Sequence, residues 1–161
     1  MKAAFFDRDG TLIKDVSYLS SIDQIEFIPQ GVQICKHLYD CGYKIFIVTN
    51  QSGIARGVFD EAFLQQTHDF LCKCLQERGI LVQACYYCPH HPREAKVERY
   101  SVTCSCRKPE PGMLMQAAHD FSIDLSQSLM FGDRPLDLQA GDAAGCRSFN
   151  ITQLFEMSWD S

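Results

Sequence analysis

Two carboxylates separated by one residue are the side chains of this sequence best placed to do chemistry. Asp7 and Asp9 follow the apolar residues 3–6, and Gly10 and Thr11 complete a tight turn. At such a spacing one carboxylate can attack a phosphorus atom while the other transfers a proton, and a divalent cation suppresses the repulsion between them. The pattern therefore indicates an enzyme that acts on phosphate groups.

Short apolar runs that alternate with amphipathic stretches predict the strands and helices that position these carboxylates. We expect strands over residues 2–6, 43–48, 82–87, 129–131 and 146–151. We expect helices after Pro29, Asp60, Pro111 and Asp133, the first ending near Gly42 and the last near Gly145. This order of elements predicts an α/β fold with a mainly parallel sheet.

Polar side chains follow three of the predicted strands. Asp7 and Asp9 come after the first strand, Thr49 and Asn50 after the second, and Asp133 after the fourth. The carboxyl ends of parallel strands share one edge of a sheet, which is where open α/β sheets bind ligands. We therefore expect these side chains to converge.

Hydrolysis of a phosphate monoester requires a nucleophile, a proton donor and neutralisation of charge. We assign Asp7 as a nucleophile that forms an aspartyl-phosphate, and Asp9 as the group that protonates the leaving oxygen and later activates water. Asp7 and Asp133, with Asp9 through its backbone carbonyl, are the expected Mg²⁺ ligands. Thr49 would donate to the transferred phosphoryl group, and Lys108 would offset its charge.

Each of these residues also has a purely structural explanation. An Asp-x-Asp-Gly segment is often a turn or a cation-binding loop, although a calcium loop would need later acidic ligands that this sequence lacks. Asp133 can simply cap a helix, Asp137 can merely orient its neighbours, and Lys108 can be a solvated surface charge. The joint occurrence of these residues on alternating strands favours the catalytic interpretation.

Composition excludes several classes of protein. The 161 residues are 46% hydrophobic with a formal net charge of −5, which suits one globular domain over residues 1–161 and opposes binding to nucleic acid. No apolar run approaches the roughly 18 residues of a membrane helix, and the sequence begins with a strand rather than a secretion signal. We therefore expect a cytoplasmic protein with no membrane partner.

The nine cysteines suggest metal ligation together with core thiols. The pairs Cys88-x-His90 and Cys104-x-Cys106 suit a closed tetrahedral zinc site that would fold a loop over about residues 88–106. His91 is a rival for His90, and the alternative is a set of reduced surface thiols. The remaining cysteines are expected to be core thiols: Cys35, Cys41, Cys72, Cys74, Cys85 and Cys146.

The four motifs together resemble those of the haloacid dehalogenase (HAD) superfamily of phosphotransferases. They are Asp7-Arg8-Asp9-Gly10-Thr11, Thr49-Asn50, Lys108, and Gly132-Asp133 with Asp137. The resemblance spans nearly the whole chain and implies a Rossmann-like three-layer αβα fold, Mg²⁺ dependence and an aspartyl-phosphate mechanism. The intervals between the motifs are too short to hold a full cap domain, so an uncapped active site is expected.

Within the superfamily, two further segments resemble the branch of histidinol phosphatases and D-glycero-D-manno-heptose 1,7-bisphosphate phosphatases. They are Cys88-Pro89-His90-His91-Pro92 and Cys104-x-Cys106-Arg107-Lys108-Pro109. The segment of residues 49–57 and the long zinc loop are more similar to those of the heptose enzymes. This resemblance implies release of the C7 phosphate of the heptose bisphosphate, in the synthesis of the heptose of bacterial surface lipopolysaccharide. Histidinol phosphate is the alternative substrate.

The same resemblance implies which residues contact a small phosphorylated sugar in a monomeric enzyme. They are Asp15, Val16, Ser17, Tyr18, Thr49, Asn50, Gln51, Ser52, Arg107 and Arg134. Arg107 would recognise the remote phosphate, because an arginine fork suits a phosphate anion.

A competing class is the phosphorylation-switch receiver domain, which also combines acidic residues, a Thr and a Lys on a parallel sheet. In receivers the phosphorylated Asp follows a central strand well into the chain, whereas Asp7 follows the first predicted strand. A long-lived phosphoryl group on Asp7 would favour this alternative.

Overall fold

The computed structural model of the protein describes residues 1–157. Its strands are β1 (Ala3–Phe6), β2 (Lys44–Asn50), β3 (Val82–Cys88), β4 (Leu129–Gly132) and β5 (Arg147–Asn150). Its α-helices are α1 (Pro29–Asp40), α2 (Glu61–Glu77), α3 (Gly112–Phe121) and α4 (Pro135–Ala144). Short 3₁₀ helices are η1 (Ile22–Gln24), η2 (Glu98–Tyr100), η3 (Leu125–Gln127) and η4 (Ile151–Leu154).

The five strands form one parallel sheet in the order β3-β2-β1-β4-β5. The central strand β1 is fully buried, as expected for a parallel strand with helices on both sides. The chain leaves β1 toward β2 on one side and later returns to β4 on the other, so the strand order reverses at β1. Open α/β sheets bind ligands at the carboxyl edge next to such a reversal.

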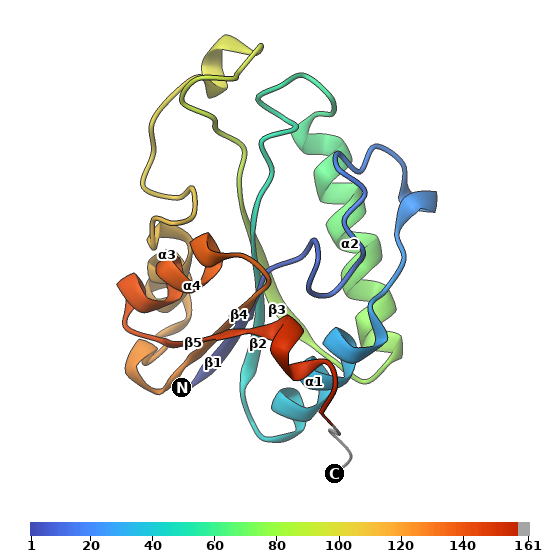
Figure 1. The fold of residues 1–161 in the computed structure, drawn as a ribbon, viewed down its shortest axis with the longest axis vertical. Coiled ribbons are helices and arrows are strands. Elements are labelled where there is room, and N and C mark those ends of the chain that lie inside the picture. The colour runs from blue at the N-terminus through green and yellow to red at the C-terminus, as the bar shows by residue number, and fades with distance from the viewer. Residues whose placement is uncertain (158–161) are drawn as a thin grey trace.

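Helices cover both faces of the sheet and make three layers (Figure 1). On one face, Leu38 of α1 and Leu71 of α2 pack with Phe6 and Ile47 from the sheet. On the other face, α3 and α4 contribute a second core that includes Leu114. This arrangement confirms the predicted three-layer α/β fold with a parallel sheet.

The helix boundaries follow from local sequence. Pro29 occupies the first turn of α1, where its missing N–H is not needed. The Asp60 side chain accepts a hydrogen bond of 2.8 Å from the Phe63 amide and caps α2. Gly145 ends α4 with a φ of +94°, a left-handed conformation that glycine adopts without strain. Sequence alone predicted all three of these signals.

The predicted strands are all present, with ends that differ by one or two residues. The prediction that six cysteines are core thiols is wrong for Cys41, which is exposed at the C-terminal end of α1. Cys35 and Cys146 are buried, whereas Cys72, Cys74 and Cys85 are half-buried. Residues on the inner face of α1 are covered by the sheet, whereas a cysteine just beyond the helix end is not.

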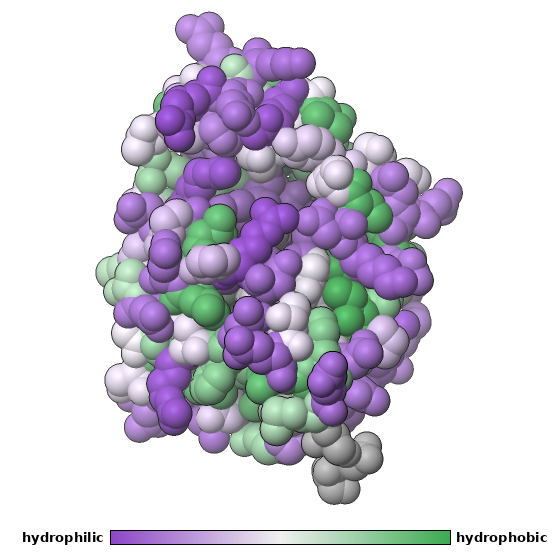
Figure 2. Space-filling view, in the orientation of Figure 1, coloured by the Kyte–Doolittle hydropathy of each residue, from purple (hydrophilic) through white to green (hydrophobic). Residues whose placement is uncertain are grey.

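The intervals between β1, β2 and β3 contain only η1, α1 and α2, and the segment between β3 and α3 contains only η2, so residues 1–157 include no separate cap domain. The segment between β3 and α3 rises above the carboxyl edge of the sheet (Figure 1). Figure 2 shows mainly hydrophilic residues over this end of the molecule. Among residues 1–157 no helix combines the length and apolar character needed to cross a membrane.

Candidate active site

A cavity of about 390 Å³ opens at the carboxyl edge of the sheet. The sequence-predicted residues that line it are Asp7, Asp9, Asp15, Ser17, Tyr18, Thr49, Asn50, Gln51, Ser52, Arg107, Lys108 and Arg134. Val16 is exposed and does not line the cavity. Residues far apart in sequence thus share one hollow because parallel strands end at the same edge.

The Lys108 ammonium lies at the base of the cavity and is buried between two carboxylates. Its Nζ donates to Oδ1 of Asp7 at 2.8 Å, to Oδ1 of Asp137 at 2.6 Å and to the Val48 carbonyl at 3.0 Å. Burial alone would lower the pKa of Lys108, but the charges of Asp7 and Asp137 outweigh burial and raise it. The lysine therefore stays charged and holds the Asp7 carboxylate in place.

The Asn50 side chain fixes the backbone of Lys108. Its Nδ2 donates to the Lys108 carbonyl at 3.1 Å, and its Oδ1 accepts from the Lys108 amide at 2.9 Å. Asn50 is the last residue of β2, so the sheet itself sets the position of a lysine 58 residues later. Asn50 lines the cavity as predicted, and these two bonds add a positioning role that the sequence did not reveal.

Asp133 completes a cluster of three carboxylates. One oxygen from each of Asp7, Asp133 and Asp137 lies within 4.8 Å of the others. Among residues 1–157, the buried Oδ1 of Asp133 has no hydrogen-bond partner. Gly10 approaches this carboxylate so closely that a Cβ atom there would lie 2.2 Å from Oδ2 of Asp133. Burial, and then the charges of Asp7 and Asp137, raise the pKa of Asp133 to about 7.

This cluster fits a Mg²⁺ ion, which prefers carboxylate oxygens. Both oxygens of Asp137 already accept protein hydrogen bonds, from Nζ of Lys108 at 2.6 Å and from the Arg134 amide at 3.1 Å. Asp7 and Asp133 are therefore the carboxylates best suited to hold the ion. Asp137 orients Lys108 and the start of α4 instead.

Asp9 lies two residues beyond Asp7 and faces the same cavity. The Gln51 amide Nε2 donates to Oδ2 of Asp9 at 3.1 Å and to Oγ1 of Thr49 at 2.9 Å. Gln51 thus links the two residues, so that the end of β2 and the turn after β1 keep a fixed separation.

Arginines surround the mouth of the cavity. Nη2 of Arg134 donates to Asp15 at 3.0 Å, and Nη1 of Arg107 donates to the His90 carbonyl at 3.4 Å. Arg56 pairs with Glu94 and lies 5.5 Å from the ring of Tyr18. Although the whole chain is acidic, this rim presents three guanidinium groups to an anionic ligand.

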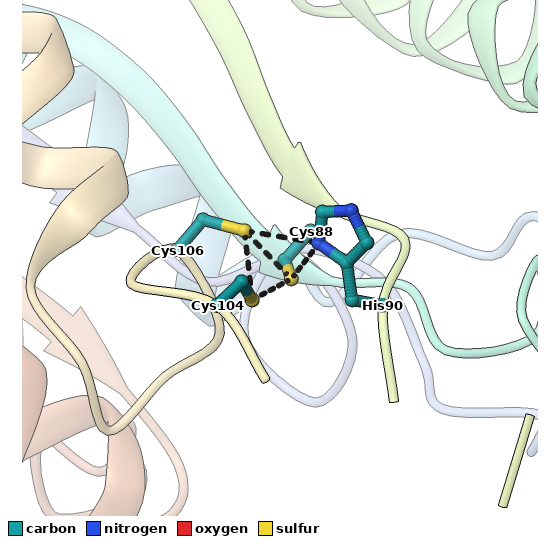
Figure 3. A group of neighbouring side chains, drawn as sticks. All are labelled: Cys88, His90, Cys104 and Cys106. Atoms are coloured by element: carbon teal, nitrogen blue, oxygen red, sulfur yellow. Dashed lines mark hydrogen bonds between the residues drawn. The ribbon is translucent and has the colours of Figure 1, made fainter. Parts of the chain in front are cut away.

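Four soft ligands converge at the end of β3 (Figure 3). They are the sulfur atoms of Cys88, Cys104 and Cys106 and the Nδ1 atom of His90. Contacts between these atoms range from 2.9 to 3.5 Å. A zinc ion with Zn–S bonds of 2.3 Å would space its sulfur ligands roughly 3.8 Å apart, so the cluster is slightly contracted relative to a tetrahedral site.

The thiols of this cluster are joined by hydrogen bonds. The bond of 2.9 Å between Cys106 and Cys88 is the largest cause that lowers the pKa of Cys106 to about 5, and the same bond raises the pKa of Cys88. His91 lies outside the cluster, because its Nδ1 accepts from the amides of Arg93 and Glu94 at 3.1 and 2.9 Å.

Known proteins are similar to this chain in sequence and in structure. A model of the HAD-hydrolase-like family matches residues 105–153. D-glycero-beta-D-manno-heptose-1,7-bisphosphate 7-phosphatase of Photorhabdus laumondii is 45% identical over 88% of this chain and 75% of its own length. The chain belongs to the D-glycero-D-manno-heptose-1,7-bisphosphate 7-phosphatase family of HAD-like hydrolases.

Two further members of the family add detail. The corresponding alpha-heptose phosphatase of the same organism is 41% identical over 90% of this chain and 79% of its own length. The crystal structure of D,D-heptose 1,7-bisphosphate phosphatase from B. bronchiseptica, complexed with magnesium and phosphate, has a TM-score of 0.79 and 36% identity, and the match covers 92% of this chain and 79% of that chain. These findings confirm the predicted superfamily and the prediction of a phosphatase.

The sequence did not settle whether several other residues belong to the site. Gly53, Arg56 and Leu136 line the cavity together with Asp137, which the motif did include. Lys14, a cation three residues after the first motif, pairs with Glu26 at 2.9 Å on the surface and does not line the cavity. Only the path of the loops distinguishes Arg56 from Lys14, and no local sequence pattern records that path.

We predict that Mg²⁺ stabilises the protein more at pH 8 than at pH 5, measured as the rise in melting temperature. The folded-state pKa of Asp133, about 7, lies above its ordinary value of 3.8. Without metal, the folded state therefore loses stability as pH rises through this window, because the carboxylate must ionise beside Asp7 and Asp137. Mg²⁺ offsets that repulsion.

Asp133→Asn should abolish most of this Mg²⁺ effect. Asp23→Asn is the matched control, because Asp23 is an exposed carboxylate of η1 and should keep the wild-type response. An equal response of wild type and Asp133→Asn to Mg²⁺ would show that the carboxylate cluster is not the metal site.

Proposed function

We propose that this protein is a Mg²⁺-dependent phosphatase that releases the C7 phosphate of D-glycero-D-manno-heptose 1,7-bisphosphate, in the synthesis of lipopolysaccharide heptose. The observation that carries the proposal is the convergence of Asp7, Asp9 and Lys108 at one end of a cavity with an arginine rim. The names of the 45% and 41% identical relatives support the choice of substrate.

In the first step the Asp7 carboxylate attacks the phosphorus of the C7 phosphate. A bond forms between phosphorus and the Asp7 oxygen, the ester bond to the sugar breaks, and Asp9 gives its proton to the leaving sugar oxygen. In the second step Asp9 takes a proton from water, whose oxygen attacks the same phosphorus. Phosphate leaves and the Asp7 carboxylate is restored.

Electrostatic stabilisation comes from groups that are already oriented. The Lys108 ammonium, 2.8 Å from Asp7, offsets negative charge on the phosphoryl group, and the Thr49 hydroxyl is positioned to donate to it. Mg²⁺ held by Asp7, Asp133 and the Asp9 carbonyl would neutralise the phosphate oxygens. Asp137 keeps Lys108 in position without touching the substrate.

The rim of the cavity suits the rest of a bisphosphate. Arg107 would bind the remote phosphate, with Arg134 and the segment of residues 15–18 contacting the sugar. Asp15 and Arg134 form an exposed ion pair of 3.0 Å, which places the guanidinium at the mouth of the cavity.

We also propose that Cys88, His90, Cys104 and Cys106 hold a structural Zn²⁺ and that residues 88–106 form a zinc loop of a single domain over residues 1–161. Four converging N and S ligands support this metal, and the pair Cys104 and Cys106 comes immediately before Arg107 and Lys108. None of the nine cysteines, all of which lie within residues 1–157, forms a disulfide, which fits a reducing cytoplasm. A monomeric state remains a prediction.

The substrate proposal predicts phosphate release, with Mg²⁺, from the alpha or beta anomer of heptose 1,7-bisphosphate. The kcat/KM for the preferred anomer should exceed that for histidinol phosphate by at least about 100-fold, because histidinol phosphate has no second phosphate for the arginine rim to bind. Asp7→Asn should lower kcat by at least about 10³-fold and serves as the blank.

Preference for histidinol phosphate would contradict the heptose assignment while leaving the chemistry intact. Stoichiometric labelling of Asp7 with slow turnover on every substrate would instead indicate a receiver-like switch. Each outcome is read from the same phosphate-release and protein-labelling assay.

The zinc proposal predicts that Cys106→Ser loses bound zinc and lowers kcat/KM about tenfold or more, because the loop no longer positions Arg107 and Lys108. Far-UV circular dichroism should still show the folded sheet. Cys41→Ser is the matched control, since Cys41 is exposed and outside the cluster. Zinc content is measured by atomic absorption. Unchanged kinetics in a zinc-free Cys106→Ser variant would overturn the positioning role.

A further inference from the structure

An arginine is buried at the centre of the catalytic motif. Arg8 lies between Asp7 and Asp9 in sequence, and only 2% of its surface is exposed. Its Nε donates to Oδ1 of Asp9 at 3.1 Å, and its Nη2 donates to Oδ2 of the same carboxylate at 3.1 Å. This two-pronged contact fixes the plane of the Asp9 carboxylate as well as its position.

The remaining arm of Arg8 contacts a buried histidine on α2. Nη1 of Arg8 lies 3.2 Å from Nε2 of His68, whose residue is 3% exposed. A guanidinium carries only donors and is always charged, so Nε2 of His68 must be the acceptor. The ring is therefore neutral, with its proton on Nδ1. Burial, and then the charge of Arg8, lower the pKa of His68 to about 3, which agrees with that state.

The contacts form a continuous chain from helix α2 to the acid–base residue. His68 holds Nη1 of Arg8, and the other two nitrogen atoms of Arg8 donate to Asp9. Nε2 of Gln51 also donates to Oδ2 of Asp9, at 3.1 Å. Without an acceptor at position 68, a buried N–H of Arg8 would lose its partner and the side chain would shift toward another one. Asp9 would then lose the fork that orients it.

We propose that His68 is a positioning residue for Asp9, acting through Arg8 as a neutral hydrogen-bond acceptor. The inference rests on the acid–base role of Asp9 in the proposed function. His68 lies on α2, outside the four motifs, and does not line the cavity. Its contribution is to hold the carboxylate where the leaving oxygen of the substrate will be.

This role has a kinetic signature that a merely structural residue lacks. An alkoxide leaving group needs a proton from Asp9, whereas p-nitrophenolate leaves readily without one. The value of kcat/KM covers only the steps up to formation of the aspartyl-phosphate, so the later activation of water does not affect it. Misplacement of Asp9 should therefore lower kcat/KM for an alkyl phosphate much more than for p-nitrophenyl phosphate.

The decisive variants are His68→Gln and His68→Asn. Oε1 of Gln is as many bonds from the backbone as Nε2 of His, so it can accept from Arg8, whereas the shorter Asn cannot reach. In His68→Asn the ratio of kcat/KM for heptose bisphosphate to that for p-nitrophenyl phosphate should fall about tenfold. In His68→Gln the ratio should stay within about twofold of wild type. Melting temperatures establish that both variants are folded.

Arg8→Lys provides a second variant, because it keeps the buried charge but has no fork, and it should lower the ratio like His68→Asn. Equal losses on both substrates, or equal ratios in the Asn and Gln variants, would overturn the proposal. If wild type prefers another alkyl phosphate, the ratio is measured with that substrate. Failure of the heptose assignment would appear as a different substrate preference of the wild type. Failure of this inference would appear in the ratios of the variants.

Discussion

The whole site depends on one buried ammonium group that holds together carboxylates that would otherwise repel each other. Asp7, Asp133 and Asp137 converge because parallel strands end at one edge, and their proximity is electrostatically unfavourable. Lys108 donates to two of the three, at 2.8 and 2.6 Å. Oδ1 of Asp133, which has no hydrogen-bond partner among residues 1–157, leaves a position suited to one divalent cation. Charge balance therefore accounts for the lysine and for the proposed metal.

Lys108 does not belong to the sheet, so the rest of the structure must bring it there. The Asn50 amide binds its backbone on both sides, which joins it to the end of β2. Two residues earlier, Cys106 belongs to the cluster of soft ligands that also includes Cys88 at the end of β3. The segment that carries the lysine is thus attached to two adjacent strands. This double attachment explains how an irregular loop can hold the Lys108 ammonium at a defined position.

The sequence predicted the features that local patterns record. Asp7, Asp9 and Asp133 follow recognisable strands, and their convergence follows from parallel strand geometry alone. It could not predict that His68 would contact Arg8, because that contact depends on how α2 lies across the sheet. The exposure of Cys41 depends in the same way on where a neighbouring layer ends. Hydrophobic periodicity indicates which face of a helix or strand is buried, whereas tertiary packing decides which residues that face contacts.

The most direct test of this account is a double-mutant cycle of Lys108→Met and Asp137→Asn at pH 7, read as the free energy of unfolding. Lys108→Met alone should cost about 3–5 kcal/mol, because it leaves buried carboxylates without their cation. Asp137→Asn in that background should recover part of the loss, with a coupling energy of about 1–3 kcal/mol. Additive effects, within about 0.5 kcal/mol, would contradict the claim that the ammonium holds the carboxylate cluster together.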